Sequence, residues 1–132
     1  MKDFSVTRNG KALDTALYIW DEKTKVFSTS EDNLVLDFQN WNGVTFITGH
    51  YCTFKTDWGC TFKTGRDCTF DTDSHCTFNT GSNCTFTCKE ECVIVRRDVF
   101  EILQPPPGIK IILNGKGVKG ISNKGEVMEA LL

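Results

Sequence analysis

The residues of this chain best suited to chemistry are seven cysteines and two histidines. A cysteine nucleophile needs an exposed thiolate and a base beside it. His75 directly precedes Cys76, but the surrounding pattern points that cysteine inward, and His50 is expected on a different coil. We therefore predict no catalytic site. An enzyme on this chain would instead have to lose activity when His50 or His75 is replaced.

The cysteine spacing is equally informative about metals and disulfides. Cys84, Cys88 and Cys92 form C-x3-C-x3-C, which matches no common zinc spacing. Stacked cysteines such as Cys52 and Cys68 would come within the Cα separation that allows a disulfide. However, the number of cysteines is odd, and the polar N-terminus shows no signal peptide. We expect reduced thiols that act as small core groups, and neither a metal nor a cofactor.

An eight-residue repeat positions these cysteines. Residues 52–91 read CTFKTDWG, CTFKTGRD, CTFDTDSH, CTFNTGSN and CTFTCKEE without a gap. The same register extends back to Leu36 and forward to Phe100, so nine octads are predicted over residues 36–107. Self-similarity at a short fixed period is typical of stacked repeat architectures.

Each octad has the pattern of one strand and one turn. Positions one and three are apolar and positions two and four are mostly polar, which predicts a half-buried strand, and positions six to eight are rich in turn residues. Glycine stands at position six in Gly49, Gly65 and Gly81, whereas Asp57 and Asp73 occupy the intervening octads. This alternation predicts two kinds of corner, and hence two octads, sixteen residues, per coil.

The predicted fold is therefore all-β, a right-handed parallel β-solenoid filled with phenylalanine. Residues 1–35 should form an N-terminal β-hairpin cap, because a first coil presents unpaired backbone that must be covered. Residues 36–107 should form the solenoid, which the prolines at 105–107 would end because proline donates no ladder hydrogen bond. Residues 108–132 should add a strand and a short helix, as a cap or an oligomer contact.

The octads of the CTFKTG type resemble the repeat stretches of bacterial and phage proteins. More loosely, they are similar to pentapeptide-repeat proteins, which are also stacked parallel coils with an inward Phe or Leu. The resemblance covers residues 36–107 and implies a shape and a bacterial or phage setting. The period here is eight rather than five, so the four-sided coil of that family is not expected.

Composition excludes several classes of function. The net charge of −2 gives no general basic field, so nucleic-acid binding is not expected. No apolar run approaches the roughly 18 residues of a membrane span. A cytoplasmic location, in a bacterium or in the host of a phage, follows as the expectation.

The leading functional prediction is a non-enzymatic protein-binding solenoid, such as a phage or bacterial host-interaction or defence-inhibiting factor. Its partner would be another protein or a second copy of the chain. The candidate contacts are corner aromatics, outward apolar residues of a late octad and the last two leucines: Trp41, Tyr51, Trp58, Val93, Val95, Leu131 and Leu132.

Two alternatives stay open. The first is a structural spacer or surface component of a virion or cell envelope, which should tolerate deletion of sixteen residues. The second is an ice-binding or surface-binding array, because the outward threonines resemble the Thr-x-Thr strands of insect antifreeze proteins. Here, however, the second outward position is not threonine but Ile47, Lys55, Lys63, Asp71 or Asn79.

Overall fold

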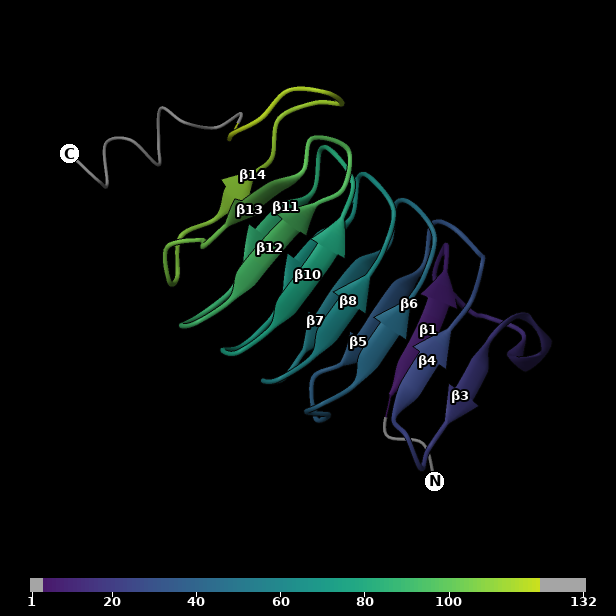
Figure 1. Ribbon diagram of the computed structural model, residues 1–132. Helices are drawn as coiled ribbons and strands as arrows, with labels where there is room; N and C mark the ends of the chain where they lie inside the picture. The colour runs from purple at the N-terminus through teal and green to yellow at the C-terminus, as the bar shows by residue number, and fades with distance from the viewer. Residues whose placement is uncertain (1–3, 122–132) are drawn as a thin grey trace.

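The computed structural model describes residues 4–121, which wind into a β-solenoid of about four turns with a period near 16 residues (Figure 1). The chain alternates between two sheets, and each central strand pairs in parallel with the strand one coil earlier. The coil is right-handed, with one sheet in front of the other in Figure 1. The predicted all-β solenoid with two octads per coil is thus confirmed.

Within residues 4–121, each sheet has seven strands. Sheet A has the order β14-β11-β9-β7-β5-β1-β2 and contains β1 (Ser5–Arg8), β2 (Lys11–Ala12), β5 (Val35–Phe38), β7 (Thr53–Thr56), β9 (Thr69–Asp71), β11 (Thr85–Thr87) and β14 (Ile111–Ile112). Sheet B has the order β13-β12-β10-β8-β6-β4-β3 and contains β3 (Ile19–Asp21), β4 (Val26–Ser28), β6 (Thr45–Ile47), β8 (Thr61–Lys63), β10 (Thr77–Thr80), β12 (Val93–Arg96) and β13 (Glu101–Leu103).

The phenylalanines at position three fill the space between the sheets. Within a sheet their rings lie parallel and stacked, as for Phe54 and Phe70 with centroids 5.1 Å apart. Between the sheets they meet edge to face, as for Phe62 and Phe70, also at 5.1 Å. Both arrangements are favourable for aromatic quadrupoles. Every such ring is buried, and so are the cysteines at position one, so each coil adds the same core layer.

The glycine corners allow one coil to reach over the next. A Cβ atom on Gly65 would lie 2.0 Å from Nδ1 of His50, a residue of the previous coil. That nitrogen accepts a hydrogen bond from the backbone N–H of Arg66 at 3.0 Å. Asp32 does the same one coil earlier, because its Oδ1 accepts from the backbone N–H of His50 at 2.7 Å. Glycine at position six therefore leaves room for a side chain that caps the next corner.

An aromatic cluster closes the N-terminal end. The predicted Asn9–Gly10 turn is present, with φ of 52° and 78°, and joins β1 to β2. The second predicted hairpin joins β3 to β4. Phe4 stacks on Phe38 with centroids 4.1 Å apart and covers the open end of the core. Parallel pairing already begins with β4, which lies inside the segment expected to form only the cap.

The predicted phase of the first octad is wrong. Leu36, assigned to position one, lies opposite Phe54 and therefore occupies position three. Leu34 takes the place of the cysteines, since its carbonyl oxygen accepts from the N–H of Thr53 at 2.8 Å. The physical reason is the corner at residues 39–43, which is longer than corners such as 57–59 and shifts the register. Phe38 is still buried, but as part of the end closure.

The predicted octad at Phe100 does not form a coil. β13 turns back and pairs antiparallel with β12, so Phe100 and Ile102, expected inside, are 90% and 73% exposed. Arg96 and Arg97 stand at positions five and six, where earlier coils have threonine and glycine. Arg97 lies back across that corner and donates to the carbonyl oxygens of Thr64 and Asn79. The chain consequently reverses instead of starting another coil.

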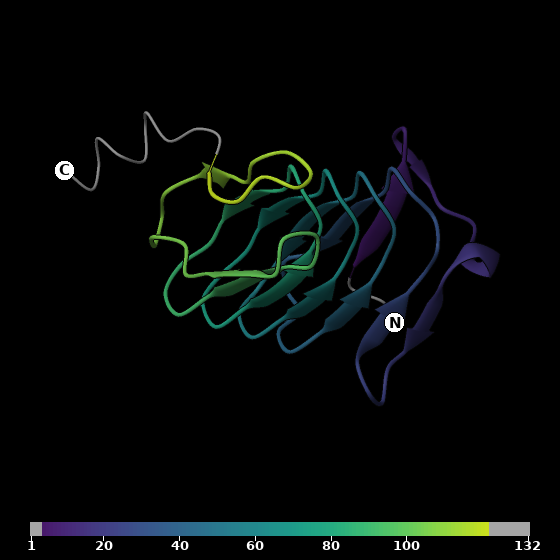
Figure 2. The same ribbon diagram turned by 45° about the horizontal axis from the view of Figure 1, so that its top comes forward.

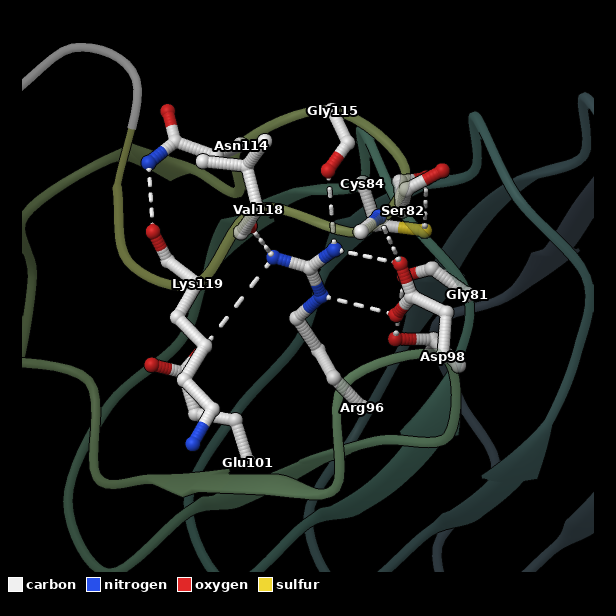
Figure 3. A network of polar contacts seen from close by, with 12 residues as sticks. Gly81, Ser82, Cys84, Arg96, Asp98, Glu101, Asn114, Gly115, Val118 and Lys119 are labelled. Atoms are coloured by element: carbon white, nitrogen blue, oxygen red, sulfur yellow. Dashed lines mark hydrogen bonds and ion pairs between the residues drawn. The ribbon is translucent and has the colours of Figure 1, made fainter.

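A buried arginine anchors the C-terminal end (Figure 3). Arg96 forms two hydrogen bonds with the Asp98 carboxylate, at 2.7 and 3.1 Å, and donates to the carbonyl oxygens of Gly115 and Val118. Burial alone would raise the pKa of Asp98, but hydrogen bonds from Arg96 and the Gly117 N–H outweigh it and hold that pKa below its usual value. This network ties the loop before Ile121 to the last coil.

The C-terminal segment is otherwise described only to Ile121. The strand predicted near residue 109 is present as β14, which pairs antiparallel with β11. The predicted short helix falls within residues 122–132, outside the described residues.

Candidate protein-binding surface

The outer face of sheet B carries two rows of side chains. The parallel register aligns the position-two residues of successive coils in one row, formed by Thr45, Thr61, Thr77 and Val93. The position-four residues form the second row, which continues onto β13 because Val95 lies opposite Ile102: Ile47, Lys63, Asn79, Val95 and Ile102. We call these two rows, together with the adjacent Phe100, the sheet B face.

The sheet B face becomes apolar toward the C-terminal end. Val93 and Val95 are half-buried there, whereas Phe100 and Ile102 extend into solvent. Ile47, two coils earlier on the same face, is 42% exposed. Lys63 is the charged member of the two rows, and the Arg97 guanidinium lies beside them, where its Nη1 donates to Oδ1 of Asn79 at 2.8 Å. Large apolar side chains grouped on one face are typical of an interaction site.

The outer face of sheet A has a different character. Its position-four row places Asp37 beside Lys55 and Lys55 beside Asp71. Opposite charges on neighbouring strands stabilise each other by only a few tenths of a kcal/mol up to about 1 kcal/mol, and they favour a hydrated surface. A partner that covered this row would have to desolvate every one of these charges. Of the two faces, sheet B therefore offers the lower desolvation cost.

β13 also presents an edge. It is the last strand of sheet B, and within residues 4–121 no strand pairs with its outer side. An edge strand offers backbone N–H and C=O groups to a further strand. Many natural edges carry charged residues or proline that discourage such pairing. In β13 the charged Glu101 is largely buried and accepts from the N–H of Gly120, and the prolines begin only at Pro105, after the strand. The outward side chains of the hairpin are Phe100 and Ile102, so apolar contact and edge pairing could act together.

The structure brings only part of the predicted site together. Val93 and Val95 lie side by side on the sheet B face. Tyr51 is exposed in the corner between β6 and β7, whereas Trp58 is exposed in the following corner, between β7 and β8. These two aromatics therefore lie at opposite edges of the coil. The hydroxyl group of Tyr51 also accepts a hydrogen bond from Nη1 of Arg66 at 2.6 Å.

The remaining predicted contacts have other positions. Trp41 packs in the N-terminal closure, with its ring centroid 5.2 Å from that of Trp20 and 6.2 Å from that of Phe4. Trp41 is therefore part of the aromatic closure and lies away from Val93 and Val95. Leu131 and Leu132 lie outside the described residues.

The most exposed apolar residues were missed by the sequence reading because they were assigned to an inward face. The octad at Phe100 keeps the apolar pattern. The octad before it, which starts at Cys92, has Arg96-Arg97 in place of the Thr-Gly pair that starts the glycine corner. That exchange was the available sign that the coil ends there.

The two histidines lie in corners, and the cysteines lie in the core. His50 caps a corner, and Nε2 of His75 lies 3.0 Å from Oε2 of Glu91 on the surface. All seven cysteines are free and buried. Burial raises the pKa of the Cys60 thiol, and a hydrogen bond with Cys68 together with burial raises that of Cys52, so both are protonated at neutral pH. Among residues 4–121, no three His, Cys, Asp or Glu side chains are grouped to hold a metal.

Comparisons add no relative to this description. No protein family model, curated protein or solved structure matches the chain. In the described part of the chain, no helix has the length and apolar character needed to span a membrane.

Proposed function

We propose that this chain is a non-enzymatic protein-binding module and that the sheet B face is its binding surface. The supporting observation is the exposure of Phe100 and Ile102 beside Val93 and Val95, on the edge hairpin of an otherwise regular sheet. Burying one such side chain contributes about 1.5–3 kcal/mol. If Phe100 and Ile102 stayed exposed to water in the functional state, the protein would not gain this burial free energy.

The proposed partner is another protein, and a second copy of this chain is the first to test. Two β13 edges related by a two-fold axis could pair antiparallel, with the same patch on both copies. Such pairing would place the Phe100 and Ile102 side chains of both copies on one surface. A different protein would use the same edge and the same apolar residues.

The test uses Ile102→Ser and Phe100→Ser in the full chain. Multi-angle light scattering measures self-association, and affinity capture from a bacterial lysate measures binding to another protein. Because about 1.4 kcal/mol corresponds to a tenfold change in affinity, each substitution should weaken binding at least tenfold. Ile19→Ser is the matched control, because Ile19 is 70% exposed on β3 at the opposite end of the same sheet.

Two outcomes would contradict the proposal. The first is a monomer that captures no partner. The second is binding that Ile19→Ser weakens as much as Ile102→Ser does.

The uniform stacking of the central coils supports the spacer alternative, for which the length of the rod rather than the sheet B face would determine function.

A further inference from the structure

A groove follows the glycine corner at the side of the sheet B face. It has a volume of about 360 Å³ and is lined by residues of successive coils, among them Ile47 and Lys63 from adjacent strands. Lys63 and Arg97 are the cationic residues of its lining, His50 also lines it, and none of the lining residues is acidic. The chain as a whole has a net charge of −2, so the groove is a local concentration of positive charge.

Hydrogen bonds hold the Arg97 guanidinium in place at this groove. Its Nη1 donates to the carbonyl oxygen of Asn79 at 2.7 Å and to Oδ1 of the same residue at 2.8 Å. Its Nη2 donates to the carbonyl oxygen of Thr64, the residue that directly follows Lys63. Arg97 therefore reaches back to the strand that carries the lysine, and the two cations lie at the same part of the groove.

Neither cation has an acidic partner. Within residues 4–121, no carboxylate forms an ion pair with Lys63 or Arg97, whereas each of the other three arginines pairs with Asp or Glu. Asp32 lies near this corner, but its Oδ1 accepts from the backbone N–H of His50 at 2.7 Å. The described part of the chain therefore leaves the positive charge at the groove uncompensated.

Lys55 shows how the same local sequence is neutralised on the other sheet. Lys55 and Lys63 both stand at position four of a CTFKT segment. On sheet A, the strand register places Lys55 between Asp37 and Asp71. On sheet B, it places Lys63 between Ile47 and an uncharged residue. The two lysines therefore differ in their charged neighbours and not in their position within the repeat.

A protein that covered the sheet B face would also remove Lys63 from water. Burial of a charge without an opposite charge strongly opposes binding, so a partner with only apolar side chains would bind poorly. A carboxylate on the partner would offset this cost and would select against neutral or basic partners. Along the second row, Ile47 lies on one side of the lysine and Val95 on the other, beyond Asn79. The complementary segment therefore has an acidic residue between apolar ones.

On the basis of the proposed protein-binding function, we propose that this groove takes an Asp or Glu side chain from a segment of a different protein, whose flanking apolar side chains pack on Ile47 and Val95. The groove lies beside β6 and β8, whereas β13 is the edge of the sheet. A second copy paired only along β13 would leave the groove open. The acidic segment consequently belongs to a protein other than this chain.

The test selects binders to the immobilised full chain from a displayed library of random peptides. We expect the selected peptides to carry Asp or Glu between apolar residues. Fluorescence anisotropy then measures the affinity of a selected peptide for each variant. Lys63→Gln should weaken binding at least tenfold, and so should replacement of the acidic residue of the peptide by its amide. Lys55→Gln is the matched control and should change the affinity less than twofold, because Lys55 lies on the other sheet.

Three results would overturn the recognition of an acidic segment: a wild type that selects no peptide, selected peptides that lack Asp and Glu, or equal effects of Lys63→Gln and Lys55→Gln. Circular dichroism confirms that both variants are folded. Arg97 stays unchanged in this test because it contributes to the reversal at the end of the last coil. Light scattering and lysate capture with Ile102→Ser decide the proposed function separately, so the groove can fail while protein binding at the sheet B face stands.

Discussion

Gly65 shows how a single residue type enables two coils to interlock. Its position lacks a side chain because the His50 ring of the previous coil lies there and accepts the Arg66 N–H. Gly81 occupies the same place one coil later, but a Cβ atom there would lie 3.3 Å from the nearest atom, which belongs to Arg66. In the glycine column formed by Gly49, Gly65 and Gly81, a methyl group is therefore accommodated better at Gly81 than at Gly65.

We expect Gly65→Ala to destabilise the protein by about 1–3 kcal/mol, because the methyl group overpacks the corner and displaces His50. Gly81→Ala should cost clearly less. Urea unfolding followed by circular dichroism measures both variants. In a His50→Ala background the cost of Gly65→Ala should fall, and an unchanged cost would show that the ring is not the cause.

Asp98 is the residue whose charge holds the C-terminal closure. Its pKa is lower in the folded protein than the unperturbed value of 3.8, so the carboxylate stabilises the fold fully at pH values above that. This contribution is lost as the pH falls below 3.8 through the folded-state pKa. Asp98→Asn leaves Arg96 buried with an incomplete partner, and breaking such a buried pair costs about 3–5 kcal/mol.

The stability difference between wild type and Asp98→Asn should therefore be largest near neutral pH and should shrink below pH 3.8. Urea unfolding at several pH values measures it. A difference that stays constant with pH would indicate that the Asp98 charge is not responsible. Asp37→Asn, on the outer face of sheet A, is a control that should have a small effect at neutral pH.

At the scale of elements, the coil is the unit that the sequence specifies best. In the central octads, the apolar alternation, the turn residues and the glycine column all indicate the same strand and corner, so local pattern alone predicted Phe54 and Phe62 on opposite walls. The end octads were predicted less well because their register depends on longer-range features. The long corner at 39–43 changes the phase of Leu36, and the reversal after Arg97 depends on contacts with Thr64 and Asn79.

Deletion of residues 60–75 should preserve the fold, because it removes one full coil and joins two equivalent corners. Deletion of residues 60–67 removes half a coil and moves every later strand to the other sheet. Asp73 would then enter the column of Gly49, where a side chain has no room. We expect cooperative unfolding for the first variant and severe destabilisation for the second, as measured by thermal circular dichroism. Equal stability of the two would contradict the two-corner coil.

At the scale of the whole molecule, the two ends are closed by different chemistry. Figure 2 shows the first strands and the last loops at opposite ends of the row of coils. Aromatic rings around Phe4 cover the N-terminal end, and the Arg96 network ties down the C-terminal end (Figure 3). Of the candidate site, Val93 and Val95 were found from their outward positions. Phe100 and Ile102 were not, because whether an apolar residue faces in or out at a chain reversal depends on where the reversal occurs.

The row formed by Thr45, Thr61 and Thr77 has a consequence for any ligand that spans several coils. A shift of such a ligand by one strand spacing, about 4.8 Å, exchanges one threonine for an identical one. The second row does not repeat, because Ile47, Lys63 and Asn79 differ in size and polarity. A ligand that slid along the rod would therefore keep nearly the same interaction energy with the threonine row, whereas its interaction energy with the second row would change at each step. The second row alone must determine the alignment of the ligand.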